Sequence, residues 1–138
     1  MDTRIEPFRP GDRISDDAEL LELAAWLADA SRPGERDLTL TWLDADDRVV
    51  GVVVPVDDAP AAPDVELTRH LGTLMREVLD EHAPGGSIVA VLGRPGDSAI
   101  GAADRAWNRA LRADPGGRVR GVFVAADGVV RPLTLDDA

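Results

Sequence analysis

The sequence predicts an α/β protein in which helices cover both faces of a mixed β-sheet, as a single three-layer domain of residues 1–138. Three segments have apolar residues at the three- and four-residue steps of amphipathic helices, and five others have apolar patterns of strand length. These segments follow one another in the order α-β-β-α-β-α-β-β, which favours a mixed sheet between two helical layers. A length of 138 residues, with 44% hydrophobic and 30% charged residues, is typical of one globular domain.

The first helix is expected after an irregular lead-in. Residues 1–14 combine prolines and a glycine with charged side chains, a composition that is typical of a segment without regular structure. Ser15 or Asp16 can then cap a helix, because the side-chain oxygen of either residue can accept a hydrogen bond from a first-turn amide. Residues 31–34 should end this helix. Its apolar stripe comprises Leu20, Leu23, Ala24 and Leu27.

A β-hairpin is expected next. In Asp37–Leu43, leucines and a tryptophan alternate with two threonines, which predicts a strand with one buried face. Val49–Val54 is almost entirely β-branched, which favours a strand buried on both faces. The short polar connector at 44–48 indicates that these two strands pair as a hairpin.

A second helix and a central strand follow an exposed loop at residues 57–63. Apolar residues recur at helical spacing from Val65 to His82, which predicts a helix with one side on the sheet. The Pro-Gly-Gly sequence at 84–86 should stop this helix. Ser87–Leu92 is an almost uninterrupted apolar run, as expected for a central strand that helices cover on both faces.

A third helix and a second hairpin complete the chain. Alanine, tryptophan and leucine recur at helical spacing in residues 103–111, and residues 114–117 should end this helix. Val119–Ala125 and Val129–Leu133 have strand patterns and flank an Asp-Gly pair at 127–128. That pair strongly favours a tight hairpin turn.

The composition excludes several classes of function. A net charge of −11 repels nucleic acids and anionic membranes, so neither is expected as a partner, although a protein with a basic face remains an alternative. Without a signal sequence or a membrane-length apolar run, a cytoplasmic location is expected. The absence of cysteine excludes thiol catalysis, disulfides and thiolate metal sites. Every basic residue is arginine, which indicates GC-rich coding, as in actinobacteria.

Motifs for histidine- or serine-based catalysis are also missing. His70 and His82 lie on one expected helix, about 18 Å apart along its axis, which is too far to share a metal ion. The sequence contains neither a His-Glu-x-x-His nor a Gly-x-Ser-x-Gly motif. The acidic residues at 44–47 lack the glycine and the later glutamate of a calcium loop. We therefore predict no catalytic residue, metal ion or cofactor.

The segment Leu92–Ser98 is the strongest candidate for a binding site. It leaves the expected central strand and leads into a helix that begins near Gly101. Ligands of α/β proteins usually bind at the carboxyl end of a central strand, and helix amino ends attract anions. Arg94, Ser98 and loop amides can therefore hold a carboxylate or a phosphate. The alternative is a simple turn, capped by Asp97 or Ser98, with Arg94 paired to a surface acid.

Two residues of the next helix complete the candidate site. Trp107 lies one turn after Asp104. Like Trp26 and Trp42, it is expected to fill core space while its indole N–H bonds to a polar group, and stacking on a ligand is the alternative. The ligand-binding candidates are thus Arg94, Asp97, Ser98, Asp104 and Trp107.

From Asp37 to Leu133, the order of elements and the loop after the central strand resemble the JAB/MPN domains, especially the RadC-like branch, with its JAB/cytidine-deaminase-like fold. In those proteins a hairpin and a helix precede a strand ending in His-x-His-Pro-Ser-Gly-Asp. A short loop with a serine and an aspartate then opens the next helix. Residues 89–97, Val-Ala-Val-Leu-Gly-Arg-Pro-Gly-Asp, look like that strand and loop. Asp104 matches the metal-binding aspartate of the family.

The chain departs from the family at the other metal ligands. Leu92 corresponds to the first ligand histidine and Arg94 to the second, and the loop is slightly shorter. Glu66 lies in the region of the family's general-base glutamate, without a secure alignment. The resemblance thus implies that Asp104 is the only assured metal ligand, whereas catalytic zinc normally has three protein ligands. Metal-dependent hydrolysis should therefore be lost.

Three functions follow as expectations. The leading one is a non-catalytic, metal-free JAB-like domain that binds a protein partner, or a small anion at Arg94. The second is an enzyme that acts on a small anionic substrate through Arg94, with Asp97 or Asp104 as general acid or base. The third is a structural module that forms homo-oligomers through an exposed strand or helix face.

Overall fold

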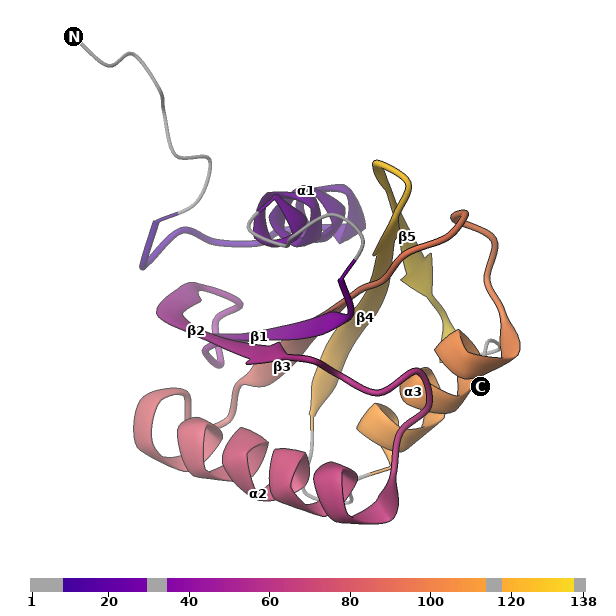
Figure 1. The fold of residues 1–138 in the computed structure, drawn as a ribbon. Helices are drawn as coiled ribbons and strands as arrows, with labels where there is room; N and C mark the ends of the chain where they lie inside the picture. Colours follow the sequence, from indigo (N-terminus) through magenta and orange to yellow (C-terminus); the bar gives the residue numbers. More distant parts are fainter. Residues whose placement is uncertain (1–8, 30–34, 114–117, 136–138) are drawn as a thin grey trace, which may run out of the picture.

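Five strands form one mixed sheet with helices on both faces (Figure 1). The computed structural model describes residues 9–29, 35–113 and 118–135. Its elements are α1 (Asp17–Ala28), β1 (Asp37–Leu43), β2 (Val49–Asp57), α2 (Val65–His82), β3 (Ser87–Gly93), α3 (Ala102–Arg112), β4 (Val119–Ala126) and β5 (Val129–Leu133). α1 covers one face of the sheet, and α2 and α3 cover the other. The predicted fold class and element order are therefore confirmed.

The strand order β2-β1-β3-β4-β5 places β3 in the middle of the sheet. β1 runs antiparallel to both β2 and β3, β4 runs parallel to β3, and β5 runs antiparallel to β4. Because β3 and β4 are parallel, the chain must cross from one end of the sheet to the other between them, and α3 makes this connection. The predicted turn joins β4 to β5. Its residues Asp127 and Gly128 have φ values of 52° and 71°, the left-handed values of a type I′ turn.

The first hairpin reverses the predicted exposure of its two strands. All residues of β1 are buried, including Thr39 and Thr41, whereas β2 alternates and leaves Val53 44% exposed. The predictions of one buried face for β1 and two for β2 are therefore wrong. The reason is position, because β1 lies between β2 and β3 while β2 forms an edge of the sheet. The buried Thr41 hydroxyl is satisfied because it donates a hydrogen bond to the Val52 carbonyl at 2.8 Å.

Alternate side chains of β3 contribute to two separate apolar clusters. Val89 and Val91 pack with α1, whereas Ile88, Ala90 and Leu92 pack with α2 and α3. Burial on both faces is expected of a central strand between helical layers. The prediction that this strand belongs to the core is confirmed.

Aspartate side chains cap the N-termini of the first two helices. Asp16 accepts a hydrogen bond from a first-turn amide of α1 at 2.8 Å, and Asp64 does the same for α2 at 2.7 Å. Of the two predicted caps of the first helix, Ser15 and Asp16, the structure thus shows Asp16. The predicted helix stops at 31–34 and 114–117 lie outside the described residues. No helix within the described ranges has the length and apolar character needed to cross a membrane.

The described end of the lead-in packs against the first hairpin. Ile14 is 1% exposed, and its N–H donates to the Asp47 carbonyl at 2.8 Å. Val49 accepts a bond from Gly11 and donates one to Asp12, both at 2.7 Å. These contacts cover the start of the β2 edge, whereas residues 1–8 lie outside the described part of the chain.

Candidate functional site

The candidate site lies where β3 ends and the chain turns towards α3. β3 ends at Gly93, and the N–H of Arg94 still extends the pairing with β4 by donating to the Ala125 carbonyl at 3.1 Å. The chain then leaves the sheet and enters α3 at Ala102. Arg94 is thus fixed at the carboxyl end of the central strand, which is the usual position of ligands in α/β proteins.

Arg94 and Asp104 form a buried ion pair with two parallel hydrogen bonds. Nε of Arg94 donates to Oδ1 of Asp104 at 2.8 Å, and Nη2 donates to Oδ2 at 2.9 Å. The two side chains are only 14% and 6% exposed. Paired bonds of this kind between charged groups are among the strongest polar contacts in proteins. The partner of Arg94 is therefore a buried acid of α3 rather than a surface acid.

The other N–H groups of Arg94 fasten its own loop. Nη1 donates to the carbonyls of Pro95 at 3.1 Å and Asp97 at 2.6 Å, and Nη2 donates to the Ala99 carbonyl at 2.8 Å. Together with the two bonds to Asp104, these contacts use all five N–H groups of the guanidinium. An anion could bind this side chain only by displacing one of these acceptors.

The carboxylate of Asp104 also has hydrogen-bond partners at both oxygens. Besides the two bonds from Arg94, its Oδ2 accepts the backbone N–H of Gly101, the residue before α3, at 2.9 Å. An acid in the first turn also suits the positive end of the helix dipole. Because the residue is 4% exposed, its carboxylate faces the guanidinium and the helix start rather than solvent.

Little space remains beside this pair. Leu92, Arg94, Asp104 and Trp107 help to line a cavity of only about 10 Å³, which is room for about one water molecule. Trp107 is 3% exposed, and its indole N–H donates to the Pro60 carbonyl at 3.1 Å. The expectation that this tryptophan fills core space and bonds a polar group is confirmed. The cavity is too small to stack a ligand against it.

Asp97 and Ser98 lie apart from this cavity. The exposed Asp97 side chain accepts the N–H of Ala99 at 3.0 Å and so closes a turn within its own loop. Ser98 is half-buried and does not line the cavity. Of the five candidate side chains, the structure therefore brings only those of Arg94, Asp104 and Trp107 to the cavity, whereas Asp97 contacts Arg94 through its backbone carbonyl.

The described residues contain no cluster of three histidine, cysteine, aspartate or glutamate side chains that could hold a metal ion. His82 is 51% exposed, with its Nε2 atom 3.8 Å from Oε2 of Glu81. Glu66 is exposed in the first turn of α2 and does not line the cavity. Asp37, a buried acid of β1, also lines the cavity. Within the described ranges, Asp104 and Asp37 are thus two acids beside Arg94, without the third ligand that a metal site of this kind needs.

A second buried polar group joins α3 to the end of β5. The Asn108 side chain is fully buried, donates to the Thr134 carbonyl at 2.7 Å and accepts a bond from Nε of Arg112 at 2.8 Å. Arg112 also donates to the Leu133 carbonyl at 3.0 Å, and desolvation by burial lowers its pKa. These bonds fasten the helix to the last strand, which is a structural role.

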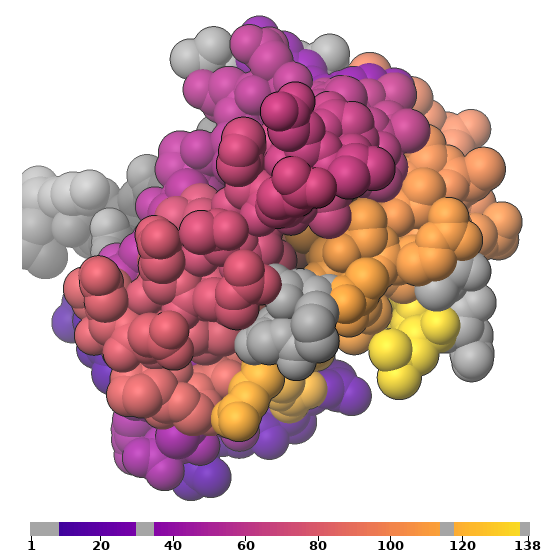
Figure 2. Space-filling view, turned by 90° about the horizontal axis from the view of Figure 1, so that it is seen from below, coloured from indigo at the N-terminus to yellow at the C-terminus, as the bar shows by residue number. Residues whose placement is uncertain are grey.

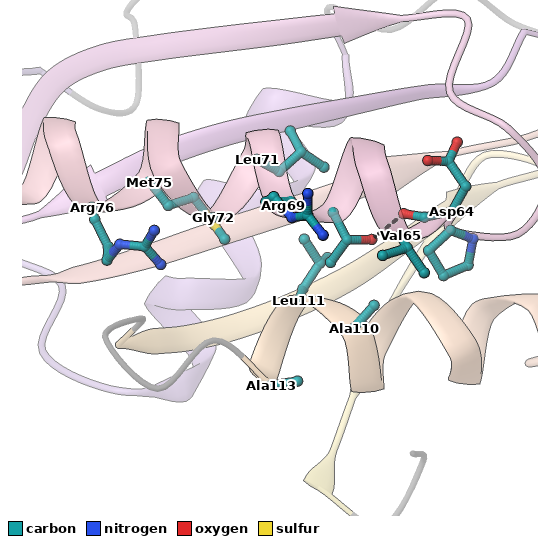
Figure 3. A pocket seen from close by; sticks show the side chains of 12 residues that line it. Asp64, Val65, Arg69, Leu71, Gly72, Met75, Arg76, Ala110, Leu111 and Ala113 are labelled. Carbon is teal, nitrogen blue, oxygen red and sulfur yellow. Dashed lines mark hydrogen bonds between the residues drawn. The ribbon is translucent and has the colours of Figure 1, made fainter.

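A larger hollow, which the sequence analysis missed, lies between α2 and α3. It is a groove of about 450 Å³ on the helical face seen in Figure 2, and Figure 3 shows its lining. Gly72 is the sequence signal that could have indicated it. A glycine inside a helix costs about 1 kcal/mol relative to alanine, so it often marks a position where a side chain would take up needed space. The groove is lined by Pro63, Asp64, Val65, Thr68, Arg69, Leu71, Gly72, Met75, Arg76, Ala110, Leu111 and Ala113.

No protein-family model matches the chain, and no curated protein matches it either. The loop held by Arg94 and the groove between α2 and α3 are therefore the features on which a functional interpretation depends.

Proposed function

We propose that this chain is a non-catalytic domain of JAB-like layout that acts by binding, with the Arg94–Asp104 ion pair in the place of the family's zinc ion. The resemblance implies a hairpin and a helix before the central strand, and after it a helix opened by an aspartate. The elements from β1 to α3 follow this order, and Asp104 lies in the first turn of α3. This agreement supports the kinship.

One observation carries the proposal. The three positions that the resemblance pairs with metal ligands, Leu92, Arg94 and Asp104, all line the same small cavity. Leu92 at the end of β3 and Asp104 in α3 thus lie at the same cavity, as the ligands of one metal ion must. Here the guanidinium supplies the positive charge, with its Nε atom 2.8 Å from Oδ1 of Asp104.

The same contacts explain why a zinc ion should not bind. A cation at Asp104 would have to displace Arg94, which would repel it and would lose its hydrogen bonds to the loop. Catalytic zinc normally has three protein ligands, and neither leucine nor a paired arginine can act as one. Hydrolysis by zinc-activated water is therefore not part of the proposed function.

Zinc uptake by the purified chain tests the first half of the proposal. The protein is incubated with excess zinc chloride and desalted, and its metal content is measured by elemental analysis. We expect far less than one zinc ion per chain. One tightly held ion per chain that is lost in an Asp104→Ala variant would contradict the proposal.

A gain of zinc binding tests the kinship itself. The double variant Leu92→His, Arg94→His restores the His-x-His pattern of the family beside Asp104. If these positions correspond, the double variant should bind about one zinc ion per chain, and the single variant Leu92→His, the matched control, should not. A double variant that is folded by circular dichroism but binds no more zinc than the control would argue against the kinship.

The geometry does not favour the alternative of a carboxylate- and arginine-based enzyme. The reactive groups of Arg94 and Asp104 are bonded to each other, and the cavity beside them has a volume of only about 10 Å³. A substrate would need space that the loop does not leave. General acid or base catalysis also requires a group within hydrogen-bond reach of the substrate.

A second candidate function, self-assembly, has one observation in its favour. β2 forms an edge of the sheet, and its segment Val50–Val54, beyond the part that the lead-in covers, contains neither a charged residue nor a proline. Val53 in this segment is 44% exposed. Natural edge strands are usually protected by charges or other devices, because an open edge can pair with another chain. Light scattering over a range of concentrations tests this function, and a monomer at high concentration would argue against it.

A further inference from the structure

The groove between α2 and α3 has the size and the lining of a small-molecule site. Its volume of about 450 Å³ lies within the range of roughly 300–1,000 Å³ that is usual for such sites. Leu71 and Met75 of α2 and Leu111 of α3 form its floor; all three belong to the core cluster on this face of the sheet and are at most 4% exposed. Val65, which is 77% exposed, and Ala110 are lining residues nearer to solvent. A ligand there would contact these two residues and lie over the core side chains.

Small residues keep this groove open. Gly72 lies on the side of α2 that lines the groove, Ala110 lies on the facing side of α3, and Ala113 follows the end of α3 (Figure 3). Larger side chains at these positions would occupy the space between the two helices. Gly72 also weakens the helix in which it lies, by about 1 kcal/mol relative to alanine. The hollow thus depends on specific residues of both helices.

Two arginines stand beside the apolar surface. Arg69 and Arg76 project from the same side of α2 and both line the groove (Figure 3). Arg69 is exposed, and no ion pair of its side chain is found within the described ranges. Asp64, the one acid in the lining, accepts the N–H of Leu67 at 2.7 Å as the cap of α2. Arg76 already has an interaction within the chain, so Arg69 is the cation that the groove offers to a ligand. In a chain of net charge −11, an exposed cation beside an apolar surface favours an anionic ligand.

We propose that this groove binds a small amphipathic anion. The apolar body of the ligand lies against Val65 and Ala110, and its anionic head pairs with the guanidinium of Arg69. The combination of an apolar surface with a cation on one side selects this class over neutral apolar molecules and over amphipathic cations. The inference rests on the proposed binding role of the domain, but it concerns a different part of the molecule from the Arg94–Asp104 pair.

Three probes that share a ten-carbon chain but differ in their head groups test the proposal. Decanoate, 1-decanol and decyltrimethylammonium are each titrated, below their aggregation limits, into the full chain at low salt. Affinity is measured by calorimetry, and the site is located by amide chemical shifts. We expect decanoate to bind at least about 10-fold more tightly than either of the other probes. This factor corresponds to the low end of the free energy that a hydrogen bond to a charged group contributes. The shifts should concentrate in residues 64–76 and 110–113.

Variants separate the two parts of the site. Arg69→Met should weaken decanoate about 10-fold and leave decanol unchanged. Arg105→Met removes the same charge from an exposed position of α3 outside the groove lining, so this matched control should bind all three probes as the parent does. Ala110→Leu should weaken every probe, and Ala113→Leu replaces it if Ala110→Leu does not fold.

The following results would overturn the proposal. No decanoate binding up to 1 mM, equal affinity for decanoate and the cationic probe, or equal loss in Arg69→Met and Arg105→Met would each do so. A dimer that buries these residues without ligand would show that a second copy covers the groove instead. Failure here leaves the zinc measurements unaffected, because those report on Arg94 and Asp104 and not on the groove.

Discussion

Replacement of Arg94 by methionine should destabilise the protein by about 3 kcal/mol. The change keeps the length of the side chain but removes the charge that Asp104 faces. Breaking a buried ion pair in this way typically costs 3–5 kcal/mol, because the remaining charge stays buried without its partner. Some solvent reaches the pair, since its side chains are 14% and 6% exposed, so we take the lower value. The carbonyls of the exposed residues Pro95 and Asp97 can bond to water instead and should add little.

Urea unfolding of four proteins measures this effect. For a chain of this size, a loss of about 3 kcal/mol corresponds to a decrease in melting temperature of roughly 10 °C. The double variant Arg94→Met, Asp104→Leu buries no charge and should recover at least about 1 kcal/mol relative to Arg94→Met alone. Arg105→Met, a change at an exposed neighbour, should stay within about 0.5 kcal/mol of the parent. A loss below about 1 kcal/mol in Arg94→Met, or a double variant no more stable than Arg94→Met alone, would refute the reasoning.

Three further changes probe the fold. Asp16→Ala removes the cap of α1 and should cost about 1 kcal/mol in urea unfolding; an unchanged midpoint would show that the cap contributes nothing. Leu40→Ala, at a fully buried position of β1, should cost about 3 kcal/mol, and a loss typical of an exposed residue would contradict the two-sided burial of this strand. A Cβ atom at Gly86 would overlap the carbonyl oxygen of Leu43, so Gly86→Ala should lower the melting temperature by several degrees. Gly101→Ala, where a Cβ has space, should cost only the poorer capping by alanine at the N-cap of α3, about 1 kcal/mol or less, and equal effects of the two alanines would refute the steric argument.

The order and extent of the elements could be predicted because each depends mainly on neighbours in sequence. The predicted Val65–His82 and Val129–Leu133 agree with α2 and β5. The exposure of β1 and β2 could not be predicted in the same way. β1 is buried because it pairs with β3 as well as with β2. In this pairing Leu40 lies opposite Ala90, which is far from it in sequence. No local pattern contains that contact.

The candidate site was predicted in part. The loop after the central strand, Arg94 and Asp104 could be singled out because a strand end, a helix start and charged residues occur together in sequence. The geometry of the ion pair and the small cavity could not, since both depend on how α3 packs against the sheet. The groove was missed for the same reason. It arises from the spacing of two helices, and Gly72 was the main local sign of it.

The loop between β3 and α3 is held by the side chain of Arg94 and not by a bound ion, so its conformation does not depend on the supply of a ligand. A loop held by a bound metal ion tightens or loosens with the free concentration of that ion, because binding stabilises a folded state by mass action. Arg94 is covalently part of the chain, so its effective concentration does not change. The conformation of this loop should therefore be indifferent to chelators and to metal starvation.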